Sequence, residues 1–392
     1  MKSVRIGIIG IGNMGSAHAV NIFKGKVNNL KLTAVCDMDV DRLQWATQTF
    51  GSEVHIYSDY HLLLESGVVD AILIATPHNL HPTIVMDGFA ANLHVLTEKP
   101  AGINTLNVRQ MNEAGKKTDR IFGIMYNQRT NPLFSHLKQM VEAGELGEMK
   151  RFVWIISNWY RTQAYYDSGA WRASWKGEGG GVLLNQCPHN LDIWQWITGM
   201  PVKIGAFCKY GHYHNITVED DVTILAEYAN AATATFITST GEYPGTNRLE
   251  YSGTKGKAVI EEGILKLYLL DIDERETCFN SKEGFPSMEV RYKEIVQQES
   301  ETAHIGILQN FTNAILHGES LLAPGYEGIL GLTISNAAYM SDWLDRWIDL
   351  PMDEKLFSQM LNKMQSNDKV IIKNNFPERL KGEYNDRWQV RW

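Results

Sequence analysis

Short runs of β-branched and other apolar residues alternate with helical patterns over the first 126 residues of the chain. Strands are expected at residues 4–9, 32–36, 71–75, 94–96 and 121–125. Helices are expected at residues 17–26, 42–50, 60–65, 82–90 and 105–117. Apolar strands that alternate with helices are typical of a parallel sheet covered on both faces. The pattern therefore predicts an N-terminal Rossmann domain over residues 1–126, built on a doubly wound parallel sheet.

From about residue 147 the strand-like runs become longer, and turn signals separate them. Strands are expected at residues 150–156, 202–209, 223–227, 233–240 and 248–252, and helices at residues 188–197, 306–317 and 326–347. This pattern predicts a C-terminal α+β domain over residues 127–392 with a large, mostly antiparallel open sheet. No Ser-, Gly- or Pro-rich linker separates the halves, so close packing is expected. Residues 353–392 are more polar, and their role stays open.

Composition and charge narrow the class of protein. The 392 residues are 44% hydrophobic and 21% charged, as in an ordinary soluble globular protein, and the formal net charge is −8. With this negative net charge, the protein has no excess of positive charge to attract nucleic acid or anionic lipid, so neither is an expected partner. The chain enters a strand pattern at once, and no run of about 18 apolar residues occurs. We therefore expect a cytoplasmic protein without a membrane partner.

The four cysteines lie far apart in the sequence. They form no C-x-x-C pair, which argues against both a disulfide framework and a zinc site. The four are Cys36, Cys187, Cys208 and Cys278. We expect them to be reduced thiols, and we predict no metal site.

Three glycines directly follow the first expected strand and open the first expected helix. Gly10 permits a tight turn, Gly12 lets the backbone approach a pyrophosphate, and Gly15 allows close helix packing. Asp37 ends the second strand, where a carboxylate can bind both ribose hydroxyls and repel a 2′-phosphate. The motif therefore predicts a site for NAD rather than NADP. Its predicted contacts are Gly10, Gly12, Asn13, Met14, Gly15 and Asp37.

Two further motifs are expected at the carboxyl edge of the parallel sheet, where ligands of open α/β sheets bind. The first could be a cofactor contact or a plain strand-to-helix turn, and its polar positions are Thr76, Pro77, Asn79 and His81. The second ends the next strand and consists of Glu98, Lys99 and Pro100. A lysine at this place could reach a substrate hydroxyl beside a nicotinamide, and Pro100 would restrict its direction. Glu98, Lys99 and Asn127 complete the predicted cofactor contacts.

A glycine-rich run at residues 179–181 leads toward a helix that is expected to begin at Pro188. His189 and Asp192 stand three residues apart on that helix and therefore share one face. An imidazole titrates near neutrality and suits proton transfer, but a lone histidine on a helix is more often structural. These residues alone leave both interpretations open.

Aromatic side chains are dense between residues 154 and 175, and polar residues lie between them. Rigid aromatic faces beside polar donors suit a sugar ring, whose faces are apolar and whose rim carries hydroxyls. Core packing or a subunit interface explains the same composition equally well. If the first interpretation holds, the candidate substrate contacts in this segment are Trp159, Tyr160, Arg161, Trp171 and Arg172.

In this order the motifs resemble those of the Gfo/Idh/MocA family, the group of glucose-fructose oxidoreductase and inositol dehydrogenase. The resemblance covers about residues 3 to 345 and includes a Pro-Gly-Tyr-Glu-Gly run at residues 324–328 that opens a late helix. It implies that Lys99 lies beside the nicotinamide and the substrate, and that His189 is a catalytic acid or base. It also implies a homodimer or homotetramer.

One position departs from the family pattern. Inositol dehydrogenase-like members carry an aspartate four residues before the helix histidine, where this chain has Asn185. A neutral amide can bind a substrate hydroxyl, but it cannot relay a proton. We therefore count Asn185 among the substrate contacts and leave proton transfer to Lys99 and His189.

The resemblance implies an NAD-dependent oxidoreductase that transfers a hydride between NAD and a secondary alcohol of a sugar, glycoside or cyclitol. Two alternatives stay open. One is a glycoside-cleaving enzyme that retains its NAD and oxidises a ring carbon transiently. The other is a non-catalytic NAD-binding regulator, against which the intact pair of Lys99 and His189 argues.

Overall fold

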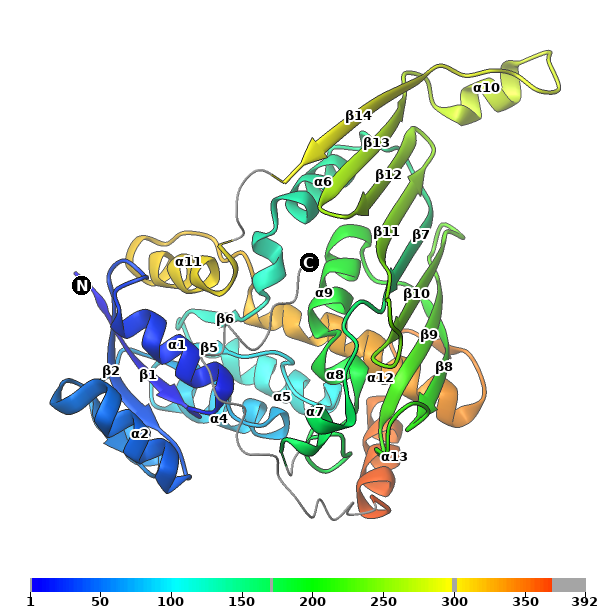
Figure 1. Cartoon of the computed structure of the whole chain (residues 1–392). Coiled ribbons are helices and arrows are strands. Elements are labelled where there is room, and N and C mark those ends of the chain that lie inside the picture. Colours follow the sequence, from blue (N-terminus) through cyan, green and yellow to red (C-terminus); the bar gives the residue numbers. More distant parts are fainter. Residues whose placement is uncertain (1, 170–171, 298–301, 369–392) are drawn as a thin grey trace.

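The N-terminal part of the chain forms a parallel sheet. The computed structural model describes residues 2–169, 172–297 and 302–368 (Figure 1), and within them this sheet has six strands in the order β3-β2-β1-β4-β5-β6. The strands are β1 (Val4–Ile9), β2 (Leu30–Cys36), β3 (His55–Tyr57), β4 (Ala71–Ile74), β5 (His94–Thr97) and β6 (Phe122–Ile124). The helices between them are α1 (Asn13–Phe23), α2 (Val40–Phe50), α3 (Tyr60–Glu65), α4 (His81–Ala90) and α5 (Thr105–Gly115). The predicted doubly wound sheet is confirmed.

A second sheet follows, and within the described ranges it has nine strands in the order β14-β13-β12-β11-β7-β10-β9-β8-β15. Its strands are β7 (Met149–Ile156), β8 (Lys203–Tyr210), β9 (Glu219–Glu227), β10 (Thr233–Ser239), β11 (Asn247–Gly253), β12 (Gly256–Glu261), β13 (Ile264–Leu270), β14 (Val290–Val296) and β15 (Ile348–Asp349). The pair of β7 and β10 is parallel, and the other paired strands are antiparallel. The mostly antiparallel open sheet is therefore confirmed.

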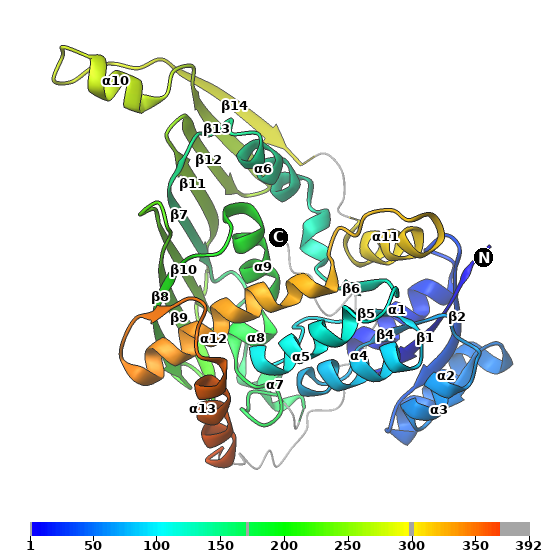
Figure 2. The same ribbon diagram turned by 180° about the vertical axis from the view of Figure 1, so that it is seen from behind.

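Helices cover one face of the second sheet and fill the space between the two sheets (Figure 1). They include α6 (Pro132–Glu142), α8 (Val182–Asn185), α9 (Pro188–Thr198) and α12 (Gly328–Leu344). Of the other helices, α7 is Gln163–Asp167, α11 (Ala303–His317) contacts β1 of the first sheet, α13 (Glu354–Ser366) packs on α5 and α12, and α10 (Glu274–Asn280) lies in a projecting arm. Figure 2 shows α12 between the sheets, where it packs against α5, α9 and β8. The expected close packing of the two halves follows from this arrangement.

The C-terminal half returns to the first sheet at several places. The backbone N–H of Ile124 in β6 donates to the carbonyl of Ala323, at 3.0 Å. The backbone N–H of Thr105 at the start of α5 donates to Asn336 Oδ1 in α12, at 3.1 Å. Because residues more than 190 positions apart share these bonds, the two sheets are held in a fixed relation.

The sequence pattern did not predict several elements correctly. Strand β3 has three residues, which is too short for a pattern, and every residue of β14 except Ile295 is exposed, so β14 buries no apolar face in the core. Helix α1 begins at Asn13 rather than at residue 17, because the helix starts directly at the glycine motif. The pattern also did not predict helices α6 and α13, which begin at N-cap side chains: Asn131 and Asp353 accept backbone hydrogen bonds at their N-termini.

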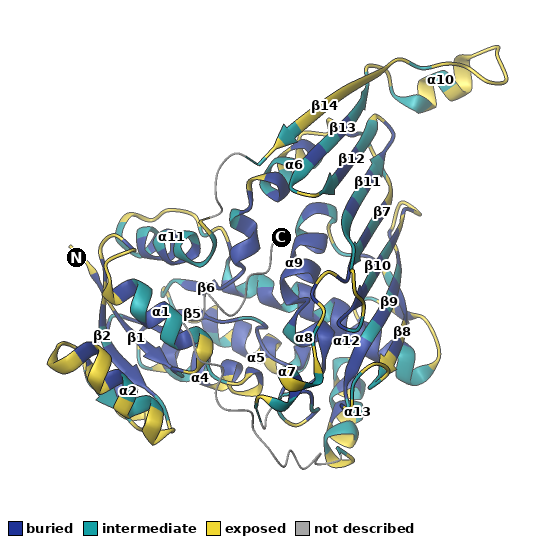
Figure 3. Ribbon diagram, in the orientation of Figure 1, coloured by how far each residue is buried: buried dark blue, intermediate teal, exposed yellow. Residues whose placement is uncertain are grey.

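The core lies beneath both sheets and around α9 and α12 (Figure 3). Part of the polar C-terminal segment joins it, because Phe357 and Leu361 of α13 are buried; residues 369–392 lie outside the described part. The four cysteines are free, and Cys278 is exposed. Within the described residues no helix is long and apolar enough to cross a membrane.

Candidate functional site

The turn between β1 and α1 has the backbone that the glycine motif predicts. Gly10 has a φ of +87°, and a Cβ there would lie 2.7 Å from the Ala75 carbonyl oxygen. A Cβ on Gly15 would lie 1.8 Å from the Gly10 carbonyl oxygen, so both positions require glycine. A Cβ on Gly12 would meet nothing within 4 Å. The turn therefore leaves open the space that a pyrophosphate needs.

The N-terminus of α1 points its free donors at this open space. Gly12 is the N-cap, and no side chain of the described residues caps the helix. Gly12 and Asn13 are exposed, and Met14 is half-buried. Uncapped N–H groups at a helix start carry a partial positive charge and bind anions such as phosphates.

Asp37 follows the end of β2 beside the glycine turn. Its Oδ2 accepts from the backbone N–H of Ile11 at 2.8 Å, and its Oδ1 accepts from that of Asp39 at 3.0 Å. These bonds hold the half-exposed carboxylate at the place expected for the adenosine ribose. Arg42, which the sequence analysis missed, donates from Nε to the Ile11 carbonyl at 2.7 Å. Its position in the first turn of α2 could have indicated this contact.

Some of the polar side chains after β4 and β6 are free to bind a cofactor, and others are already bonded within the protein. Thr76 Oγ1 and Asn127 Oδ1 are buried and have no hydrogen-bond partner among the described residues, so both can serve a ligand. Pro77 and Asn79 are exposed. The ring nitrogens of His81 lie 2.8 Å from the carbonyl oxygens of Pro100 and Thr76, so this ring braces the two turns.

Together these features fit NAD. The residues present an open cradle at Gly12, uncapped donors at α1, a carboxylate at Asp37 and unpaired polar atoms at Thr76 and Asn127. The described residues contain no group of three His, Cys, Asp or Glu side chains that could hold a metal ion.

Lys99 lies between the two halves of the molecule. Its peptide bond to Pro100 is cis, and its Nζ donates to the backbone carbonyl of Asn185 at 2.9 Å. Burial lowers the pKa of the ammonium, while the charges of Glu98 and Glu178 oppose this shift. Burial thus brings the pKa of Lys99 closer to the range in which a lysine can act as a base.

Glu98 anchors the backbone beside the lysine. Its carboxylate is buried, lies 2.7 Å from His18 Nε2 of α1, and accepts the N–H of Lys99 at 3.1 Å. Burial alone would raise the pKa of this carboxyl, but the hydrogen bond with His18 and the neighbouring positive charges lower it to about 2. Glu98 therefore stays ionised and is committed to His18 and the Lys99 backbone.

His189 occupies the first turn of α9 and is 7% exposed. Its Nδ1 is buried without a hydrogen-bond partner among the described residues, and its ring packs edge-on against Tyr126. Burial, followed by the positive charge of Lys99, holds the pKa of His189 well below its usual range. The imidazole is therefore neutral near pH 7 and has a free nitrogen.

Asn185 ends α8 and is linked to a buried carboxylate that the sequence analysis missed. Its Nδ2 donates to Glu178 Oε1. Glu178 also accepts the N–H of Ala173 at 2.7 Å and lies 3.7 Å from Arg172 Nη1. The only signal in the sequence is a glutamate directly before the glycine run.

Asp192 does not join His189 in the way that a shared helix face suggests. Both of its oxygens accept from Arg129, from Nη2 at 2.6 Å and from Nε at 2.8 Å. Arg129 also pairs with Glu327 at 2.5 Å. This buried group ties the turn after β6 to α9 and to the start of α12, and we assign Asp192 a structural role.

Most of the aromatic segment is core. Trp154, Trp159, Tyr166 and Trp175 are buried, whereas Tyr160 is 47% exposed. Arg161 donates to the backbone carbonyls of Trp159 and Tyr160, and Arg172 donates to Tyr165 Oη at 2.9 Å. Trp171 lies outside the described residues. Core packing therefore explains most of the density of aromatics.

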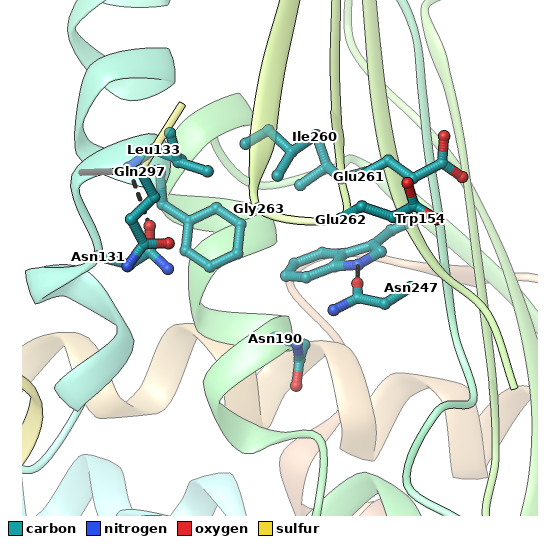
Figure 4. A pocket seen from close by; sticks show the side chains of 12 residues that line it. Asn131, Leu133, Trp154, Asn190, Asn247, Ile260, Glu261, Glu262, Gly263 and Gln297 are labelled. Atoms are coloured by element: carbon teal, nitrogen blue, oxygen red, sulfur yellow. Dashed lines mark hydrogen bonds between the residues drawn. The ribbon is translucent and has the colours of Figure 1, made fainter. Parts of the chain in front are cut away.

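A separate small pocket lies under the second sheet (Figure 4). It has a volume of about 30 Å³ and is lined by residues of α6, α9 and the sheet, including Trp154, Asn190 and Asn247. The Asn190 amide is buried without a partner among the described residues. A volume of this size holds one water and excludes a sugar, so this pocket is not a substrate site.

Both halves of the chain match models of the same protein family. Residues 4–126 match the model described as "Oxidoreductase family, NAD-binding Rossmann fold", and residues 134–259 match that of the GFO/IDH/MocA C-terminal domain. Myo-inositol 2-dehydrogenase of Thermotoga maritima is 27% identical over 86% of this chain and 96% of its own length.

Two solved structures share the fold over the whole length of their chains. The WlbA dehydrogenase from Bordetella pertussis in complex with NADH and UDP-GlcNAcA has a TM-score of 0.74 at 23% identity and covers 90% of this chain and 100% of its own. Levoglucosan dehydrogenase in complex with NADH and levoglucosan has a TM-score of 0.74 at 19% identity and covers 89% of this chain and 100% of its own.

Proposed function

The chain belongs to the GFO/IDH/MocA family of NAD-binding oxidoreductases, and from this we propose that it transfers a hydride between NAD and a secondary alcohol of a sugar, glycoside or cyclitol. The observation that carries the proposal is the position of Lys99, whose ammonium bonds the Asn185 backbone beside the neutral His189. Relatives named as inositol and levoglucosan dehydrogenases support this class of substrate.

Bound NAD would supply the hydride acceptor for the carbinol carbon. Lys99 takes the hydroxyl proton in its neutral form, which burial favours by lowering its pKa. His189 is neutral and has an unpaired Nδ1, so it can accept a proton or bind a second hydroxyl. Asn185, the exposed Tyr160, Arg161 and Arg172 are further substrate contacts in this proposal.

A panel of inositols, free sugars, glycosides and nucleotide sugars, followed by NADH absorbance, tests this function. With the best substrate, Lys99→Met and His189→Ala should each lower kcat by roughly 10² to 10⁴, the usual contribution of a positioned proton-transfer group. NAD binding should persist in both variants. Near-normal turnover in either variant would remove that residue from the mechanism, and glycoside cleavage without net NADH would favour the NAD-retaining alternative.

We also propose that the protein is a cytoplasmic homodimer or homotetramer that associates through the second sheet. Phe207 of β8 and Tyr292 of β14 expose 60% and 53% of their surface on this sheet, and such an assembly could cover them. Light scattering of the purified protein measures its mass. A monomer at micromolar concentration would contradict this assembly.

A further inference from the structure

Glu178 is a buried carboxylate beside the lysine of the proposed active site, and the proposed mechanism does not use it. Its side chain is 2% exposed. The Asn185 amide and the Ala173 backbone N–H both donate to it, and the Arg172 guanidinium lies 3.7 Å away. Its own backbone carbonyl faces His78 Nδ1 at 3.2 Å. A buried carboxylate is costly unless such partners compensate it, so its location needs an explanation.

The bond between Asn185 and Glu178 fixes the orientation of the amide. An ionised carboxylate only accepts hydrogen bonds, so the NH₂ group of Asn185 must face Glu178. Asn185 Oδ1, an acceptor, is thereby left for another partner. The backbone carbonyl of the same residue receives the Lys99 ammonium. Asn185 thus links the carboxylate of Glu178 to the amine of Lys99.

The charged and titratable groups around Lys99 show which of them can balance the charge of its ammonium. The carboxylates that influence Lys99 are Glu98 and Glu178, and Glu98 is already bonded to His18 and to the Lys99 backbone N–H. The other groups that interact with Lys99 are Arg172, Cys187, His78, His81, His189 and His304. Burial keeps Cys187 and the four histidines neutral by raising the pKa of the thiol and lowering those of the imidazoles. Of these two carboxylates, Glu178 is therefore the one that also accepts a hydrogen bond from Asn185.

We propose that Glu178 is a positioning residue for the reaction, which orients the Asn185 amide toward the substrate hydroxyl and balances the charge of the Lys99 ammonium. In this way the chain keeps a carboxylate near the lysine although position 185 holds an amide. The inference rests on the proposed function for its effect on turnover. Its effect on Lys99 itself can be measured without any substrate.

A purely structural role for Glu178 would be to support the turn before the glycine run, because Ala173 has a φ of +55° and donates to it. The substitution Glu178→Gln separates the two roles, since it keeps the shape and one acceptor oxygen but removes the charge. The introduced amide would present its NH₂ group to Asn185, whose own amide must then rotate by 180° and lose Oδ1 as a free acceptor.

The double variant Glu178→Gln/Asn185→Asp transfers the carboxylate from position 178 to position 185 instead of removing it. The introduced glutamine can then donate to the introduced aspartate, so the bond between positions 178 and 185 reverses its direction. The other oxygen of position 178 still accepts the N–H of Ala173, so these groups stay paired. The single variant Asn185→Asp places two carboxylates in contact, which is unfavourable. A positioning role therefore predicts that the double variant works better than either single variant.

The first measurement is the titration of Lys99. After reductive methylation with ¹³C-formaldehyde, its NMR signal is assigned by its absence in Lys99→Met, and circular dichroism checks that each variant is folded. The pKa of Lys99 should fall in Glu178→Gln, because a negative charge that favours the ammonium is lost, and should rise again in the double variant. An unchanged titration in a folded Glu178→Gln variant would overturn the inference.

The second measurement is turnover with the best substrate of the panel. Glu178→Gln should lower kcat about 10- to 100-fold with little change in NAD affinity, and it should move the acidic limb of the pH profile to lower pH. The double variant should recover part of this loss, whereas losses that simply add would indicate a structural role. If the Glu178→Gln variant does not fold, Glu178→Asp is used in its place. It keeps the charge, so Lys99 should titrate as in the native protein. A lowered pKa of Lys99 in Glu178→Asp would overturn the inference.

The two proposals fail in different ways. If no compound of the panel yields NADH, the proposed function fails while the Lys99 titration still decides the role of Glu178. If turnover is found but neither the titration nor kcat responds to Glu178→Gln, the function stands and this inference fails.

Discussion

At the scale of single residues, the site is defined by what burial does to ionisable groups. Burial lowers the pKa values of Lys99 and His189, and both shifts favour the neutral forms that can accept a proton. Glu98, equally buried, stays ionised because His18 donates to it. The outcomes differ because the hydrogen bond with His18 and the nearby positive charges outweigh burial at Glu98, whereas burial outweighs the opposing charges at Lys99 and His189.

Asp37 should decide the choice of cofactor. Asp37→Ser removes the carboxylate that binds the ribose hydroxyls, so the affinity for NAD should fall about 10- to 100-fold, and that for NADP should rise. Fluorescence titration with both dinucleotides measures the change. Asp39→Ser is the matched control, because it removes a nearby carboxylate that caps α2 and should leave the preference intact. A native protein that already prefers NADP would contradict the assignment.

Glu219 should make stability depend on pH near neutrality. Burial raises its pKa to about 7, although Gly181 N–H, Leu183 N–H and the Tyr339 hydroxyl donate to it. The folded state then binds more protons than the unfolded state between pH 4.5 and 7, so the free energy of unfolding should fall by about 3 kcal/mol as pH rises through this window.

Urea unfolding between pH 5 and 8 tests this dependence. The variant Glu219→Gln cannot titrate at this position, so its stability should vary less with pH than that of the native protein. Parallel curves for the two proteins would show that Glu219 is ionised in the folded state throughout this range.

At the scale of elements, the candidate site depends on where α8 and α9 begin. Glu219 of β9 accepts the backbone N–H groups of Gly181 and Leu183, and thereby fixes the start of α8. Arg129 joins α9 to the turns on either side through Asp192 and Glu327. Carboxylates and a guanidinium from other elements therefore set the positions of Asn185 and His189.

Breaking the pair of Arg129 and Asp192 should destabilise the protein without a direct effect on chemistry. Arg129→Met leaves the buried Asp192 with the Gln195 amide but without its ion-pair partner, which should cost about 3 to 5 kcal/mol in urea unfolding. The double variant Arg129→Met/Asp192→Leu removes both charges and should recover much of this loss. If Asp192→Asn abolished turnover at unchanged stability, Asp192 would belong to the reaction rather than to the scaffold.

At the scale of the whole molecule, the site lies where two sheets of different architecture meet. The first sheet contributes the glycine turn and Lys99, and helices packed on the second contribute Asn185 and His189. Helices α11 and α12 return to the first half and hold the two parts together (Figure 2). A dinucleotide bound at the glycine turn should therefore stabilise the molecule as one unit.

NAD should raise the melting temperature of the native protein. At 100 times its dissociation constant it would add about 2.7 kcal/mol to the free energy of unfolding. Gly12→Val should abolish this rise but keep the melting temperature of the free protein, because a Cβ at Gly12 meets no atom within 4 Å. Gly15→Val is the contrasting variant and should lower stability itself, since its Cβ would collide with Gly10. An NAD-dependent rise in Gly12→Val would place the pyrophosphate elsewhere.

The sequence determined the features that depend on local backbone conformation and on hydrophobic periodicity. The alternation of apolar strands and helices predicted the six-stranded sheet except for β3, which is too short to carry a pattern. The glycine turn was readable because only glycine fits at Gly10 and Gly15. Lys99 and His189 could be selected because each lies in a short motif at the end of a strand or the start of a helix.

Only the tertiary structure decided which partners the polar side chains find. Lys99 meets Asn185 across 86 positions of the chain, and Arg129 meets Asp192 across 63. The burial of Trp159 and Trp175, which left Tyr160 as the exposed aromatic beside them, was equally invisible in the sequence. Local patterns record the conformation of neighbouring residues, but the desolvation and pairing of a charge depend on which distant elements pack around it. For this reason neither the burial of Glu178 nor its contact with Asn185 could be predicted from the sequence.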